Sequence, residues 1–233
     1  MERLDKVLSG TGRWSRREVK ELVRRGRVLL DGVPAASPEQ KIDPETADIR
    51  VDGETVSCRR FTYVLLHKPA GVLSAVEDSR QRTVLDLLPQ ELKRQGLSPV
   101  GRLDKDTEGL LLLTNDGALT HRLLSPKSHV DKVYYARTEG TPTEADAARL
   151  AQGITLADGL RCLPAELKIC GQGQVLLTLR EGKYHQVKRM LASRGKPVVY
   201  LKRLGMGKLK LDPALPAGAW RPLTPEELAD LGR

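Results

Sequence analysis

The amino-acid sequence predicts an α+β protein with two domains, a small α/β module over residues 1–60 and a larger domain over residues 61–233. Two helical patterns and a few short strands fill the first 60 residues. After Phe61, short apolar strands are interspersed with helical segments, which favours a mixed sheet. The sequence contains no glycine-rich dinucleotide or phosphate loop, so a nucleotide-cofactor fold is not predicted.

Composition narrows the class of partner. Lys and Arg number 39 against 30 Asp and Glu, which gives a net charge of +9 and favours a polyanionic partner, nucleic acid first. Cys58, Cys162 and Cys170 are odd in number and lack metal-ligand spacing, so we expect reduced thiols in a cytoplasmic protein. The charged N-terminus holds no apolar segment long enough for a signal peptide or a membrane span, and no membrane partner is expected.

The first module is predicted to begin with two helices. Apolar residues at helical spacing occupy residues 3–8, and Gly10–Gly12 interrupts that helix. Ser15 with Glu18 three residues later forms a capping box that opens the second helix, and Gly26 suits its C-terminal cap. The strands predicted after it are Val28–Leu30 and Ile49–Val51.

Basic residues are concentrated on the second helix. Seven of them lie between Arg13 and Arg27, opposed only by Glu18 and Glu21. Their three- and four-residue spacing places most of them on one face, away from the apolar residues. A solvated helix face is the alternative, but this excess of charge favours contact with phosphates. The predicted RNA contacts of this module are Arg13, Arg16, Arg17, Lys20, Arg24 and Arg25.

The rest of the chain alternates strands and helices. Ser57–Phe61 is the predicted linker, and His67–Gly71 contains the turn sequence Lys-Pro-Ala-Gly. The predicted strands are Tyr63–Leu66, a strand that begins within Ser128–Tyr135, and Val175–Leu179. The predicted helices are Thr83–Leu88, Glu91–Arg94, Ala118–Leu124 and Thr143–Ala151.

A carboxylate-rich loop precedes the most apolar strand of the chain. Gly101–Gly109 carries Asp104, Asp106 and Glu108, and the leucine run that follows reads as a buried strand. Reacting groups are often placed on loops that rigid strands hold, although an acidic surface turn is the commoner outcome. A calcium loop that starts at Asp104 would need a bidentate Glu at its twelfth position, which is Asn115, so no metal site is predicted.

A second stretch, Glu181–Leu191, is basic. Gly182 allows a sharp turn from strand to helix, and the helix start together with Lys183, Lys188 and Arg189 suits an anion. A basic surface helix is the alternative interpretation.

These stretches resemble one family. The segment Gly101–Gly117 closely resembles the catalytic motif of the RsuA-type pseudouridine synthases, and Glu181–Leu191 resembles the last catalytic motif of that family. Residues 1–60 resemble the S4 RNA-binding domain, through Arg-Leu-Asp-Lys-Val-Leu at residues 3–8 and Gly-Arg-Val-Leu-Leu-Asp-Gly at residues 26–32. The resemblance spans nearly the whole chain and implies the pseudouridine synthase fold, a largely antiparallel sheet with a central cleft.

The resemblance also implies roles for individual residues. Asp104 matches the nucleophile, Tyr134 matches the tyrosine that lies against the target base, and Lys188 matches the basic residue that pairs with the nucleophile. Arg189 is the alternative partner of Asp104. The further RNA contacts expected in this domain are Lys68, Arg102, Lys183 and Arg189.

The implied reaction converts uridine to pseudouridine within RNA, which requires no cofactor and no metal. The implied target is uridine 516 of 16S rRNA, in free rRNA or in a small-subunit assembly intermediate, and we expect the enzyme to be a monomer. Three alternatives remain open: a pseudouridine synthase that acts on 23S rRNA, a non-catalytic RNA-binding protein of ribosome assembly, and a glycosidase that uses Asp104 with Asp106.

Overall fold

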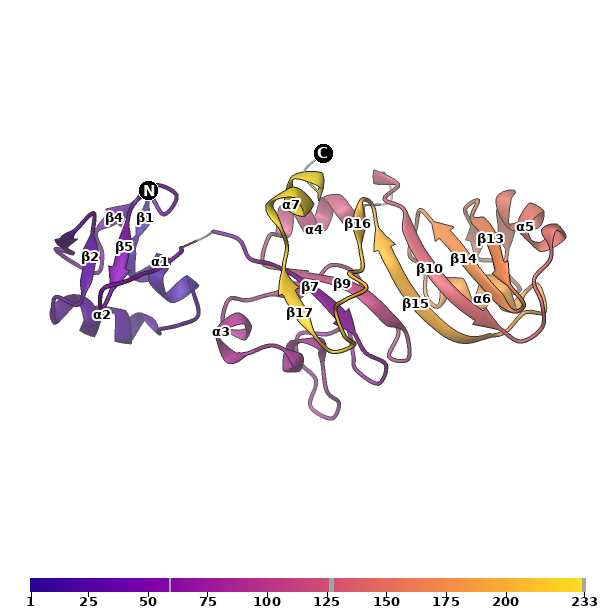
Figure 1. The fold of residues 1–233 in the computed structure, drawn as a ribbon, viewed down its shortest axis with the longest axis horizontal. Helices are drawn as coiled ribbons and strands as arrows, with labels where there is room; N and C mark the ends of the chain where they lie inside the picture. The colour runs from indigo at the N-terminus through magenta and orange to yellow at the C-terminus, as the bar shows by residue number, and fades with distance from the viewer. Residues whose placement is uncertain (59, 126–127, 232–233) are drawn as a thin grey trace. The chain divides into compact units, whose positions relative to one another are not determined.

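The computed structural model describes residues 1–58, 60–125 and 128–231 (Figure 1). Its contacts divide the chain into two compact units. The first comprises Met1–Thr62 and Leu88–Ser98, and the second comprises Tyr63–Leu87 and Pro99–Arg233. The sequence-based boundary between residues 60 and 61 stays a prediction, and Arg59 of the predicted linker lies outside the described residues.

In the first unit, α1 (Leu4–Gly10) and α2 (Arg16–Arg24) share one hydrophobic core with the strands. The predicted capping box of α2 is confirmed. Ser15 Oγ accepts a hydrogen bond from the backbone N–H of Glu18 at 3.3 Å, and Glu18 Oε2 accepts one from the backbone N–H of Ser15 at 2.6 Å. The core residues of this unit include Leu4, Leu8, Val19, Leu22, Val28, Ile49 and Val51.

The strands of the first unit are short. They are β1 (Glu2–Arg3), β2 (Val28–Leu30), β3 (Val33–Pro34), β4 (Lys41–Ile42), β5 (Ile49–Val51) and β6 (Glu54–Thr55). They form a sheet of order β3–β2–β5–β6 and a separate β1–β4 pair. The short helix α3 (Gln90–Lys93) belongs to this unit, where Gln95 Nε2 donates a hydrogen bond to the carbonyl of Thr11 at 2.7 Å.

The second unit is built on one large sheet. Its strands are β7 (Tyr63–Lys68), β8 (Ser98–Pro99), β9 (Glu108–Thr114), β10 (Lys132–Thr138), β13 (Glu166–Gly171), β14 (Gln174–Leu179), β15 (Val198–Met206), β16 (Leu209–Lys210) and β17 (Trp220–Pro222). The main order is β13–β14–β10–β15–β9–β7–β17, with β16 beside β15 and β8 beside β9. The pairing of β15 with β9 is parallel, whereas the other neighbours along the main order are antiparallel. The predicted α+β class with a mixed, largely antiparallel sheet is confirmed.

Two hydrophobic cores lie on either side of the β9–β15 pairing. The remaining elements are the 3₁₀ helix η1 (Val84–Leu87), α4 (Gly117–Leu124), α5 (Glu144–Ala151), α6 (Gln186–Ala192), α7 (Pro225–Leu231) and the strand pair β11 (Ile154–Thr155) and β12 (Arg161–Cys162). One core joins β10, β13, β14 and β15 to α5 and α6. The other joins β7 and β9 to α4 and α7. Both cores contribute side chains near the loop that carries Asp104.

The structure gives the exact bounds of several predicted elements and corrects one of them. The segment Thr83–Leu88, predicted to be helical, contains the 3₁₀ helix Val84–Leu87. The strand expected to begin within Ser128–Tyr135 does so, at Lys132. The strand predicted as Tyr63–Leu66 continues to Lys68, because His67 and Lys68 pair with β9. That extension carries Lys68 into the interior of the sheet.

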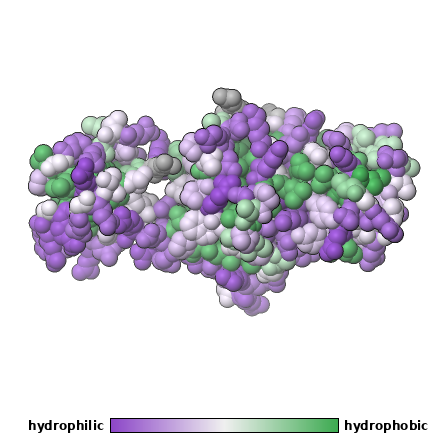
Figure 2. Space-filling model, in the orientation of Figure 1, coloured by the Kyte–Doolittle hydropathy of each residue, from purple (hydrophilic) through white to green (hydrophobic). Residues whose placement is uncertain are grey.

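Figure 2 shows a hydrophilic surface over the part of the first unit where Figure 1 places α2. Among the described residues, no helix is long and apolar enough to cross a membrane.

The three cysteines are free thiols, and burial raises the pKa of Cys58 to about 11, which makes it a poor nucleophile.

Candidate active site

The loop that carries Asp104 has a fixed backbone. The buried Ser74 Oγ donates a hydrogen bond to the carbonyl of Leu103 at 2.9 Å and accepts one from its N–H at 3.1 Å. The N–H of Thr107 donates to the carbonyl of Asp104 at 3.1 Å, which closes a turn. At the far end of the loop, Gly109 adopts a φ of 112°, and a Cβ there would lie 2.2 Å from the carbonyl oxygen of Arg203. Only glycine therefore allows β9 to approach β15 at this point.

Lys68 ties the same loop to β7 from beneath. Its side chain is fully buried, and Nζ donates to the carbonyls of Asp104, Lys105 and Thr107 at 3.0, 3.2 and 2.8 Å. Nζ also donates to a fourth carbonyl, that of Pro69, at 3.1 Å. Burial lowers the pKa of Lys68 to about 8, although the nearby carboxylates oppose that shift. The prediction that Lys68 contacts RNA was wrong, because its ammonium group is inside the protein.

Lys188 on α6 is the charged partner of Asp104. Its Nζ lies 3.1 Å from Oδ2 of Asp104 and 2.6 Å from Oδ1 of Asp106. Burial by itself would lower the pKa of Lys188, but the hydrogen bonds to Asp106 and Asp104 outweigh burial and raise it. Lys188 is therefore a cation at neutral pH, shared between two carboxylates.

The two carboxylates differ in their exposure to water. The side chain of Asp106 is 73% exposed, so water screens its attraction to Lys188 even though it is the nearer group. The side chain of Asp104 is 26% exposed. The hydrogen bond from Lys188 lowers the pKa of Asp106, whereas the acid of a glycosidase needs a raised pKa. The geometry thus argues against a carboxylate-pair glycosidase.

Arg189, the alternative partner, faces elsewhere. Its guanidinium lies 2.5 Å from Oδ2 of Asp158. Of the two adjacent basic residues, Lys188 is the one that the structure places on Asp104.

A pocket brings Asp104 and Tyr134 together. Tyr134 on β10 is 8% exposed and belongs to the core of β10, β14 and α6. The residues that line the pocket are Arg102, Leu103, Asp104, Thr107, Tyr134, Leu179, Glu181, Gly182, Lys183, His185, Gln186, Val187 and Leu201. The lining thus comes from the loop, from β10, β14, β15 and α6, and from the turn before α6, and it includes both an aromatic side chain and a carboxylate.

Three residues at this site were missed by sequence reasoning. His185 Nε2 lies 3.4 Å from Oδ1 of Asp104. Thr107 Oγ1 is buried, lines the pocket and has no hydrogen-bond partner in the described part of the chain. Ser74 fixes the residue before Asp104. Each is far from its partners in sequence or looks like an ordinary polar residue, so no local signal identified it.

Arg102 and Lys183, the other predicted RNA contacts of this unit, differ in how free their side chains are to bind a phosphate. Arg102 is exposed and borders the pocket. Lys183 is held at the turn before α6 by the carbonyl of Arg161 and by Glu181, whose Oε2 lies 2.9 Å from Nζ.

The basic residues predicted on the first unit are all exposed. Several have ion-pair partners: Arg13 lies 3.2 Å from Glu54, and Arg24 and Arg25 both pair with Glu21. A surface pocket on this unit is lined by Arg3, Asp5, Lys6, Arg16, Arg17 and Lys20. The cations around this pocket form a concentrated positive surface.

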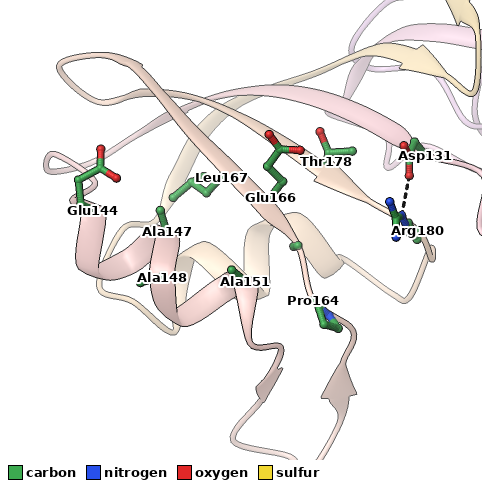
Figure 3. A pocket seen from close by; sticks show the side chains of 11 residues that line it. Asp131, Glu144, Ala147, Ala148, Ala151, Pro164, Glu166, Leu167, Thr178 and Arg180 are labelled. Carbon is green, nitrogen blue, oxygen red and sulfur yellow. Dashed lines mark hydrogen bonds and ion pairs between the residues drawn. The ribbon is translucent and has the colours of Figure 1, made fainter.

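A separate cavity of about 660 Å³ lies between α5 and the strands β13 and β14 (Figure 3). Its wall includes three alanines of α5, and the ion pair of Arg180 with Asp131 closes one end at 3.0 Å. None of the residues predicted for catalysis or RNA binding lines it.

Known proteins support the family resemblance. The family described as RNA pseudouridylate synthase matches residues 62–193, and the S4 domain matches residues 2–47. An uncharacterized RNA pseudouridine synthase of Bacillus subtilis (strain 168), YtzG, is 51% identical over 230 residues, covering 97% of this chain and 96% of that protein. A crystal structure of a pseudouridylate synthase superposes with a TM-score of 0.70 at 35% identity, covering 99% of this chain and 100% of the other.

Relatives with assigned targets fall in two groups. The ribosomal small subunit pseudouridine synthase A of Pseudomonas aeruginosa is 40% identical over 237 residues, covering 98% of this chain and 100% of that protein. The ribosomal large subunit pseudouridine synthase B of Bacillus subtilis is 38% identical over 237 residues, covering 99% of this chain and 96% of that protein. With both domains matched and the fold shared, the chain belongs to the RNA pseudouridylate synthase family, in its RsuA-type branch with an N-terminal S4 domain.

Proposed function

We propose that this protein is an isomerase that converts a uridine of ribosomal RNA to pseudouridine, with Asp104 as the nucleophile. The observation that carries the proposal is the placement of Asp104. Its backbone is fixed by Lys68 and Ser74, its carboxylate pairs with Lys188, and it lines the same pocket as Tyr134.

The reaction exchanges one bond to the ribose for another. The bond from N1 of uracil to C1′ breaks, the base turns, and C5 bonds to C1′, while C5 loses a proton and N1 gains one. A carboxylate can act as a covalent nucleophile in such glycosyl chemistry. The target base must leave its stack to reach the pocket, where the ring of Tyr134 would pack against it.

Asp104→Asn tests the role of the nucleophile. The amide keeps the shape of the side chain but lacks the charged oxygen, so we expect no tritium release from RNA labelled at C5 of uridine. Asp106→Asn is the matched control, because Asp106 shares Lys188 but does not line the pocket. We expect the control to keep most of its activity. Turnover by Asp104→Asn protein that is free of deamidation would refute the assignment.

For the target we propose uridine 516 of 16S rRNA. The small-subunit relative and the S4 match support it. A large-subunit relative of nearly equal identity makes 23S rRNA the competing target. Pseudouridine mapping in both rRNAs, from cells with and without the gene, decides between them. Loss of a 23S signal with position 516 intact would overturn the target and leave the chemistry in place.

A further inference from the structure

An exposed aromatic stack lies beside Asp104, outside the steps described above. The rings of Tyr184 and His185 are 3.8 Å apart between centroids and inclined by only 19°. Tyr184 is 74% exposed, while His185 Nε2 lies 3.4 Å from Oδ1 of Asp104. The stack therefore extends from the nucleophile into solvent.

The turn that presents this stack is braced by hydrogen bonds. His185 adopts a left-handed conformation with φ of 49° immediately before α6. Gln186, which is buried, braces the turn: its Oε1 accepts from the N–H of Lys183 at 3.0 Å, and its Nε2 donates to Glu181 at 2.5 Å. A non-glycine residue in this backbone region is uncommon and is often found at functional sites. The structure thus fixes the position of an exposed tyrosine that contributes little to its own core.

The scarcity of aromatic residues makes this placement informative. The chain has one Phe, two Trp and five Tyr among 233 residues. One tyrosine, Tyr134, lines the pocket itself, and Tyr184 stacks on the histidine that lies beside the nucleophile. Exposing a large aromatic side chain beside a site that acts on RNA is consistent with base stacking, the usual role of such rings in RNA recognition.

We propose that Tyr184 receives an unpaired RNA base next to the uridine that is isomerised. This proposal rests on the proposed function, since it requires that uridine enters the pocket at Asp104. When a base leaves its stack, its neighbour loses a stacking partner, and an aromatic face can replace that partner. Arg102, exposed at the edge of the same pocket, supplies positive charge for the backbone of that strand. Tyr184 is thus a positioning residue that holds the strand without touching the reacting atoms.

The test distinguishes stacking on an aromatic ring from burial against any apolar side chain at position 184. We would compare Tyr184→Phe, Tyr184→Leu and Tyr184→Ala in single-turnover tritium release, using 16S and 23S rRNA transcripts labelled at C5 of uridine. Val199→Ala is the control, since Val199 is an exposed apolar residue, 57% exposed, on β15. Unfolding midpoints of all variants check the fold.

We expect Tyr184→Phe and the control to match the wild type. Tyr184→Leu and Tyr184→Ala should raise the half-saturating enzyme concentration about 5- to 150-fold, the range expected for removal of one base stack, with a smaller change in the limiting rate. A leucine variant as good as the phenylalanine variant would overturn the proposal, because apolar cover would then suffice. Wild-type behaviour of all three variants would overturn it as well.

Failure of the proposed function is distinguishable from failure of the stack. If the wild type releases no tritium from either transcript, the proposed function fails. The stack is then measured by binding of the same transcripts to Asp104→Asn protein, with and without the substitutions at Tyr184. Weaker binding with leucine but not with phenylalanine supports stacking, and equal binding refutes it.

Discussion

The loop at Asp104 and the basic face of α2 both carry charge, but their charged side chains differ in exposure and in how firmly they are held. At the loop, Asp104 and Lys188 are mostly buried, with side chains 26% and 23% exposed, and buried hydrogen bonds fix the backbone. On α2, Lys20 and Arg24 have side chains 56% and 76% exposed. The partner of Arg24 is Glu21 on the same helix, at 2.5 Å.

The difference fits the role proposed for each region. Bond-breaking requires a reacting group held within a fraction of an ångström, and a small misplacement lowers the reaction rate strongly. Neutralising phosphates requires positive charge at the surface, and long mobile side chains serve that purpose well. Substitutions should therefore act on the reaction step at the loop, and on affinity and salt dependence at α2.

Apart from loss of the nucleophile itself, the largest expected effect comes from removing the cation at the loop. Lys188→Gln leaves Asp104 and Asp106 side by side with no ammonium between them, so Asp104 loses its orientation. We expect the limiting rate of tritium release to fall about 100-fold or more, with RNA affinity changed far less. Arg189→Gln is the control, because Arg189 pairs with Asp158 on another part of the unit. Equal losses in both variants would show that only the charge of α6 matters.

Lys68→Met removes the tether beneath the loop. Carbonyls of Asp104, Lys105 and Thr107 lose their donor, and the free energy of unfolding should fall by about 1–3 kcal/mol. Urea unfolding monitored by circular dichroism measures this change.

The pH dependence of that change has a definite sign. The folded-state pKa of Lys68, about 8, lies below its ordinary value of 10.5, so the unfolded chain binds more protons between these values. The stability of the wild type relative to Lys68→Met should then rise from pH 8 to 10.5. A stability difference that falls with pH would mean that the ammonium form is favoured inside the protein.

On α2 the expected effect is gradual. Replacing Arg16, Arg17 and Lys20 with Gln should weaken binding of rRNA transcripts. The slope of log affinity against log salt should flatten by about 0.7–0.9 for each phosphate that the protein no longer neutralises. The limiting rate should be unchanged. The control replaces three exposed lysines of the second unit with Gln, namely Lys168, Lys208 and Lys210. If both sets flatten the slope equally, the α2 face has no special part in binding.

The smallest expected effect is that of chelation. Asp104 and Asp106 point at Lys188, and Glu108 Oε2 accepts a hydrogen bond from the hydroxyl of Tyr200 at 2.7 Å. With these partners engaged, EDTA should leave tritium release intact on an RNA that folds without Mg²⁺. A decrease that Mg²⁺ restores, with RNA structure unchanged, would indicate a metal at this loop.

Local patterns predicted the parts of the fold that local forces determine. The capping box of α2 and the buried leucine run of β9 follow from neighbouring residues, and both were identified. Lys68 was misassigned, because a lysine before a turn looks exposed and its partners on the loop lie more than 30 residues away. The strand β15 was not predicted, since Lys202 and Arg203 interrupt its apolar pattern and the burial of Arg203 depends on the carbonyl of Leu110. The chemical roles at the site remain proposals.

The short parallel contact between β9 and β15 has a mechanical consequence. It pairs Lys202 with Glu108 and Arg203 with Gly109, and it joins two parts of the unit that each have a separate core. Asp104 enters from the β9 side, while Lys188 and Tyr134 belong to the other. A small rotation about this seam would change the width of the pocket and the separation of the ion pair together. The register of this seam therefore sets both the width of the pocket and the placement of Asp104 against Lys188.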